Sequence, residues 1–99
     1  MGVREMKGKH VAFVFVDVAP GKDKKVLEKL MEYDEVVEAH LIAGEYDVLA
    51  VLELELYGAA IFTSPQEAVS NFVIEKVRKL RDVRDTNTIY PTYSVTKRE

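Results

Sequence analysis

The tetrapeptide Gly44-Glu45-Tyr46-Asp47 places a glycine, a phenol and two carboxylates directly before an apolar run that starts at Val48. Glycine permits positive φ and a close approach of backbone to ligand, and nearby amide N–H groups can bind a ligand carboxylate. The two carboxylates can accept hydrogen bonds from an ammonium group. The pattern therefore suits a small zwitterion, and an ordinary hairpin turn remains an open alternative.

Two threonines, Thr86 and Thr88, form a second candidate site in the segment "RDTNT". Side chains two residues apart on a strand project to the same face, so both hydroxyl groups face one way. In the predicted sheet these threonines need not touch the Gly44–Asp47 turn within one subunit. We expect the two places to be able to meet across a contact between subunits.

Few residues point to catalysis or metal binding. Glu38 and His40 share a strand face and would form a metal site with Asp17 or Glu53, but a hydrogen-bonded histidine at a dimer interface is the preferred interpretation. Glu53 and Glu55 resemble an acid–base pair, and the solvated half of an amphipathic strand explains them more simply. We expect no catalytic residue, no metal and no cofactor.

The hydrolase and nucleotide-binding motifs are missing from the sequence. The three serines at positions 64, 70 and 94 lack the flanking glycines of a nucleophile elbow. The sequence contains neither a phosphate-binding loop nor a dinucleotide fingerprint. These classes of enzyme are therefore not indicated.

Hydrophobic periodicity predicts four long strands and two helices. "SPQE" is a helix-start signal, with Ser64 as the cap, Pro65 at the first helical position and Glu67 able to complete a capping box. The predicted elements are a strand over 10–18, a helix over 22–33, strands over 36–43 and 46–56, a helix from 65 to 81, a strand over 84–90 and a short edge strand at 92–95.

The order β-α-β-β-α-β predicts an α+β, ferredoxin-like sandwich with an antiparallel sheet and both helices on one face. A sheet with one wet face should alternate apolar and polar residues. The strands at 10–18 and 48–52 are instead apolar on both faces. Since two helices cover only one face, we expect a dimer formed through the other.

Composition narrows the partners. The 99 residues carry a net charge of −3 and no cysteine. The densest basic clusters, Lys22–Lys25 and Lys76–Arg84, alternate with acids and suggest solvated helix faces, so direct DNA binding is not expected. No segment reaches the ~20 apolar residues of a membrane span, and the start lacks a signal peptide. We expect a cytoplasmic protein that does not bind membranes.

The stretch "VVEAHLIAGEYDVLAVLEL", followed by a predicted helix and "VRDTNTIY", resembles the ligand-binding half of the Lrp/AsnC regulators, also called the RAM domain. The G-x-Y-D turn, the V-x-x-T-x-T approach to the last strand and "PGK" before the first helix carry the resemblance. It extends over most of the chain, so the RAM effector-binding domain is assigned to 9–96, with 1–8 and 97–99 as flexible ends.

The resemblance implies a βαββαβ domain that dimerises through its sheets and assembles dimers into rings, commonly octamers. It also implies a small effector, usually an amino acid, bound between dimers, and co-assembly with full-length regulators. The residues that it implies as ligand contacts are Gly44, Glu45, Tyr46 and Asp47, with Thr86 and Thr88 near the same cleft.

Two departures from the family pattern stand out. Only about nine residues precede the first strand, where full-length regulators carry a helix-turn-helix, so a stand-alone domain is expected. The link Tyr57–Ser64 is longer than the family norm and is positioned to cover or reshape the cleft.

Two other function classes stay open on this fold. One is a small dimeric α/β-barrel enzyme, similar to monooxygenases or isomerases, with His40, Glu38 and Asn71 as candidates in a cavity between sheet and helices. The other is a structural partner module without a ligand. A cavity inside each subunit would favour the enzyme over an effector-binding domain.

Overall fold

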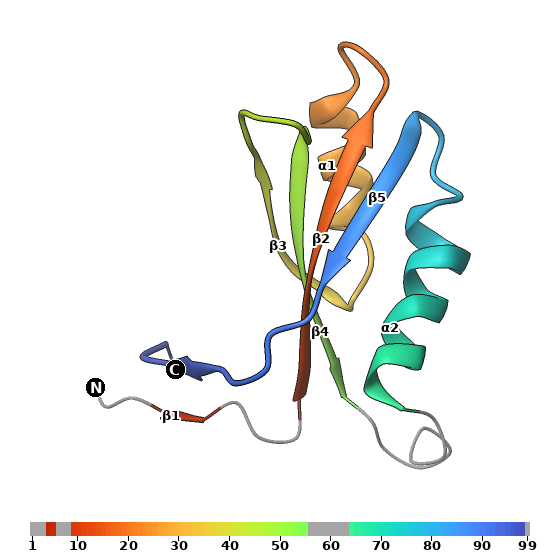
Figure 1. Cartoon of the computed structure of the whole chain (residues 1–99). Coiled ribbons are helices and arrows are strands. Elements are labelled where there is room, and N and C mark those ends of the chain that lie inside the picture. Colours follow the sequence, from red (N-terminus) through yellow and green to blue (C-terminus); the bar gives the residue numbers. More distant parts are fainter. Residues whose placement is uncertain (1–3, 6–8, 56–63, 99) are drawn as a thin grey trace.

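Strands and helices of the main unit follow one another in the predicted order β-α-β-β-α-β. The computed structural model describes residues 4–5, 9–55 and 64–98. The main sheet and its helices comprise β2 (Lys9–Val18), α1 (Asp23–Leu30), β3 (Val36–Leu41), β4 (Val48–Glu55), α2 (Pro65–Phe72) with a π-helical extension η2 (Val73–Val77), and β5 (Val83–Ile89). Figure 1 shows their arrangement.

The four strands form one antiparallel sheet in the order β3-β4-β2-β5. The first and third strands of the βαββαβ unit are thus central, and the last lies beside the first. This order confirms the predicted α+β, ferredoxin-like fold. Because β2 and β4 have neighbours on both sides, they have no free edge.

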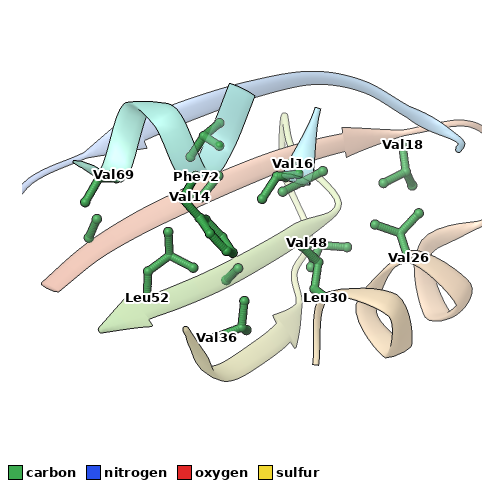
Figure 2. Close-up of a cluster of buried hydrophobic side chains, with 14 residues drawn as sticks. Val14, Val16, Val18, Val26, Leu30, Val36, Val48, Leu52, Val69 and Phe72 are labelled. Carbon is green, nitrogen blue, oxygen red and sulfur yellow. The ribbon is translucent and has the colours of Figure 1, made fainter. Parts of the chain in front are cut away.

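The core lies between the sheet and the two helices, as Figure 2 shows. Alternate residues of β2 and β4 point into it, and Val26 and Leu30 of α1 and Val69 and Phe72 of α2 cover them. All buried residues of the described part are apolar. They are Ala12, Val14, Val16, Val18, Val26, Leu30, Val36, Val48, Ala50, Leu52, Val69, Phe72, Val73 and Val77.

The start of α2 is confirmed. The hydroxyl oxygen of Ser64 accepts a hydrogen bond from the backbone N–H of Glu67 at 3.1 Å, and Pro65 opens the helix. The later part differs from the prediction, because the helix widens into a π turn in which the N–H of Arg78 donates to the carbonyl of Val73 at 2.8 Å. This i→i+5 bond accommodates one more residue in the turn than an α-helix does.

Element ends differ from the prediction by a few residues. Helix α1 stops at Leu30, since Glu32 and Tyr33 bond three residues back, to Lys29 and Leu30, in a tighter turn. Strand β3 ends at Leu41 and β4 begins at Val48, so the polar turn between them is longer than expected.

Two short strands lie apart from the main sheet. β1 (Arg4–Glu5) pairs antiparallel with β6 (Val95–Thr96), with Arg4 opposite Thr96. A short strand was expected near β6, and its partner is the N-terminal segment rather than the sheet edge (Figure 1). Residues 57–63 of the long link lie outside the described residues.

Helix length bears on membrane insertion. Within residues 4–5, 9–55 and 64–98, no helix is both long and apolar enough to cross a bilayer.

Replacing Leu30 by alanine is expected to lower the free energy of unfolding by about 2–5 kcal/mol, because Leu30 is fully buried and truncation leaves a cavity. Met31 is the matched control: it is 45% exposed, and Met31→Ala should cost less than about 1 kcal/mol. Urea titration at one fixed protomer concentration measures both. Equal losses in the two variants would contradict the core as described.

Candidate functional site

The Gly44–Asp47 turn is fixed to the end of the central strand β2 by Asp47. The backbone N–H of Asp47 donates to the carbonyl of Val16 at 3.0 Å, and its carbonyl accepts from the N–H of Ile42 at 2.9 Å. Its carboxylate oxygen Oδ2 accepts from the N–H of Val18 at 3.0 Å. Asp47 therefore organises the turn, and one of its two carboxylate oxygens is already used.

The exposed part of the turn offers unused polar groups. Gly44 has a backbone φ of 142°, which residues other than glycine rarely adopt. The backbone N–H groups of Gly44, Glu45 and Tyr46 meet no acceptor among the described residues. The Glu45 side chain is exposed beside them. The same exposed turn thus supplies hydrogen-bond donors and a carboxylate at the mouth of β4.

Tyr46 differs from its neighbours because its ring packs on the sheet. The ring centroid lies 5.7 Å from that of Phe15, with the planes tilted by 43°. Phe15 lies on the sheet face that the helices leave uncovered, so Tyr46 extends that face toward the turn.

The two threonines lie at the same end of the sheet but on the other face. Thr86 pairs with Val16, which in turn pairs with Val48, so Thr86 is about two strand spacings, ~10 Å, from the start of β4. Directly opposed residues share a face, so Thr86 and Thr88 face the helix layer with Val16 and Val14. The structure therefore brings the predicted site residues to one end without converging them into a single cleft within one subunit.

The uncovered sheet face has an apolar centre and a polar rim. Its centre comes from the two middle strands and consists of Val11, Phe13, Phe15, Leu49 and Val51. The edge strands contribute Glu38 and His40 on one side and Asp85, Asn87 and the exposed Ile89 on the other. We refer to these ten residues as the open face, whose rim is polar except at Ile89. This distribution of polarity is typical of protein–protein interfaces.

Glu38, His40 and Arg98 form a polar cluster on the rim. One carboxylate oxygen of Glu38 lies 2.9 Å from Nε2 of His40, and the other accepts from Nη1 of Arg98 at 2.6 Å. The hydrogen bond to His40, and then that to Arg98, holds the pKa of Glu38 below its ordinary value. A hydrogen-bonded His40 is thus observed, and both oxygens of Glu38 are used.

The other acidic candidates do not complete a metal site. Asp17 pairs with Asp85 at the far end of the sheet, and Glu53 lies at the opposite end of the same face, opposite Val11. Among the described residues, no group of three His, Cys, Asp or Glu side chains is placed to hold a metal ion. The side chain of Glu55 lies outside the described part, so its predicted pairing with Glu53 stays a prediction.

Sequence reasoning missed the structural role of Asp47, which it had named only as a ligand contact, and missed Arg98 altogether. The structural role of Asp47 had no pattern of its own, because the bond to Val18 joins positions 29 residues apart. The contact of Arg98 with Glu38 joins positions 60 residues apart, and an arginine near a chain end carries no local signal of such a partner.

Comparisons of the sequence and the fold with those of known proteins point to one family. The family model for the Lrp/AsnC ligand-binding domain matches residues 11–55. A solved structure titled FFRP-DM1 is 30% identical, with a TM-score of 0.68 over 83% of this chain and 97% of that one. This chain is a member of the Lrp/AsnC ligand-binding domain family.

Relatives of this Lrp/AsnC domain include longer proteins. An uncharacterized HTH-type transcriptional regulator, PF0250 of Pyrococcus furiosus, is 33% identical over 81 residues, which are 79% of this chain and 48% of that protein. The Lrp/AsnC domain thus spans about half the length of the curated relatives it matches. The solved regulator NMB0573 of Neisseria meningitidis, a complex with L-Met, shares the fold at 21% identity, with a TM-score of 0.61 over 91% of this chain and 51% of that one.

The alternative of a barrel-type enzyme finds no assembled site in the Lrp/AsnC domain. Its three candidates were Glu38, His40 and Asn71. Glu38 and His40 lie on the open face, whereas Asn71 is exposed on α2, which covers the opposite face. They therefore do not line a common cavity between sheet and helices.

Replacing Asp47 by alanine is expected to lower the free energy of unfolding by about 1–3 kcal/mol, because the half-buried N–H of Val18 loses a charged acceptor. Asp47→Asn keeps an oxygen acceptor and should recover part of this loss. The control is Glu45→Ala in the same turn, which should change stability by no more than about 0.5 kcal/mol. Chemical denaturation compares the three variants. Equal effects of Asp47→Ala and Glu45→Ala would refute the conclusion that Asp47 fixes the turn to the end of β2.

Proposed function

We propose that this Lrp/AsnC domain binds a small amino acid at the Gly44–Asp47 turn and couples binding to the assembly of a transcription regulator. The proposal is limited to that turn, since Thr86 and Thr88 face the helix layer. Its partners are the effector, further copies of the chain and full-length regulators of the family. No catalytic step is part of the proposal.

One observation carries the proposal. Three successive N–H groups, those of residues 44–46, meet no acceptor among the described residues, and the exposed Glu45 in the same turn supplies a carboxylate. An α-amino acid presents a carboxylate and an ammonium group a few ångströms apart. Amide donors suit the first of these groups, and a carboxylate acceptor suits the second.

The relatives support a regulatory role. PF0250 and FL11 of Pyrococcus furiosus are both named HTH-type transcriptional regulators. NMB0573 shares the fold and is titled a complex with L-Met. Apolar and small amino acids are accordingly the first ligands to test with this domain.

The open face supports assembly. Its apolar centre would remain in contact with water in a single chain, whereas pairing two open faces removes it from water and leaves the polar rim at the edge. An isologous dimer places the same patch on both subunits. A ligand that binds only the assembled form stabilises that form by mass action, which links effector binding to assembly.

The ligand-binding part is tested by screening the twenty amino acids at millimolar concentration by thermal shift and sedimentation velocity. A ligand at one hundred times its Kd stabilises the folded form by about 2.7 kcal/mol, which raises Tm by several degrees. In Glu45→Gln the ligand-induced rise should shrink, while the Tm without ligand stays the same. If no amino acid changes Tm or sedimentation, the sensing function is wrong.

Replacing Phe13 by aspartate is expected to convert the dimer into monomers, because a charge in the apolar centre of the open face would be buried without a partner. Ile74→Asp is the control, since Ile74 is 54% exposed on the outer side of η2. Sedimentation velocity separates the two species. A wild-type chain that sediments as a monomer, or a dimer that survives Phe13→Asp, would disprove dimerisation through this face.

A further inference from the structure

The fold joins two basic segments that lie far apart in the sequence. Lys22–Lys25 includes the start of α1, and Lys76–Arg84 runs from the end of η2 into the start of β5. Figure 1 shows the start of α1 and the start of β5 at the same end of the sheet. No pattern in the sequence indicated that these segments are neighbours.

A backbone hydrogen bond of Asp82, with a long ion pair beside it, links the two segments. The carboxylate oxygen Oδ2 of Asp82 lies 3.9 Å from Nζ of Lys25, and the carbonyl of the same residue accepts a hydrogen bond from the N–H of Ala19 at 2.8 Å. Lys22 is tied to the same place, because its N–H donates to the carbonyl of Ala19 at 3.0 Å. The backbone φ of Asp82 is 76°, a left-handed conformation that few residues other than glycine, asparagine and aspartate adopt.

The cations of this corner are exposed, and most of them are unpaired. Lys25 forms an ion pair with Asp82. For the other seven, no carboxylate of the described part of the chain lies within ion-pair distance. We define the basic corner as Lys22, Lys24, Lys25, Lys76, Lys79, Arg78, Arg81 and Arg84.

The charge of the chain is strongly segregated. Residues 22–25 and 75–85 contain these eight cations and four acids, Asp23, Glu75, Asp82 and Asp85, which gives a formal charge of +4. The whole chain carries −3, so the remaining residues carry −7. A local field of one sign attracts partners of the opposite sign even when the net charge of the protein is unfavourable.

We propose that the basic corner binds the phosphate backbone of a nucleic acid. Three of its cations are arginines, whose guanidinium groups match phosphate oxygens in a two-point geometry. Duplex DNA carries one negative charge per ~1.7 Å, a density that a cluster of exposed cations neutralises with release of counterions. The expectation of no nucleic-acid binding rested on net charge and on treating the two basic segments separately.

The acidic groups of a second copy fit this corner less well than phosphates do. Glu38 is bound by His40 and Arg98, and Glu32 lies 3.5 Å from the ammonium group of Lys29. Glu53 also has a partner. Glu28 and Glu45 are exposed and form no ion pair with the described residues. What favours a nucleic acid over a second copy is therefore the charge density of its phosphate backbone.

The test is fluorescence anisotropy of the full chain with a labelled 20-base-pair duplex, from 50 to 200 mM KCl. We expect binding, and the logarithm of the observed association constant should fall linearly with the logarithm of the salt concentration. In the double variant Arg81→Gln, Arg84→Gln the slope should fall by about 2, and affinity at 50 mM should drop at least tenfold, since each phosphate contact contributes about 0.9 to the slope.

The matched control removes two charges elsewhere, as Lys29→Gln with Lys97→Gln, and should change the slope by less than about 0.5. Circular dichroism verifies that both variants fold. Absence of binding at 50 mM, or equal weakening in the control, overturns the proposal. Poly-L-glutamate that competes as strongly as unlabelled duplex also overturns it, in favour of an acidic protein surface. The amino-acid response is measured separately and does not affect this result.

Discussion

The central strands β2 and β4 carry apolar side chains on both faces, and a domain of this size has only two helices to cover them. One face is therefore desolvated within the chain, by Val26, Leu30, Val69 and Phe72. The other face keeps its apolar centre outside the core. Burial of apolar area is the main favourable term in folding and in association. On this sheet the same two strands supply the apolar side chains for both processes. Any partner of the open face contacts residues that alternate with core residues.

The end of β2 is the second organising point. Val18 donates its N–H to the carboxylate of Asp47, and the next residue, Ala19, donates to the carbonyl of Asp82. Two successive N–H groups thus hold the polar turn before β4 and the turn before β5. The candidate ligand site and the basic corner are therefore attached to two adjacent residues, the last of β2 and the one that follows it, and a shift of that strand end would displace both.

The sequence predicted those features that depend on local pattern. The unbroken apolar runs identified β2 and β4, and Ser64 with Pro65 identified the start of α2 because capping is decided by neighbours in the chain. The pairing of β1 with β6 was not predictable, since strands of two residues show no periodicity. The same holds for the contact of Arg98 with Glu38 and for the neighbourhood of Lys25 and Asp82, which only the tertiary fold brings together.

The π turn of η2 has an electrostatic consequence. If the α-helix continued regularly from Val69, Lys76 would lie nearer the middle of the buried stripe than Val77, because the side-chain direction repeats every 3.6 residues. The wide turn delays the rotation by about one residue, so Val77 is buried and Lys76 is exposed. A lysine ammonium in an apolar core is costly. A regular α-helix would point Lys76 toward the core. The irregular turn avoids this and places the charge of Lys76 on the outer surface of the protein.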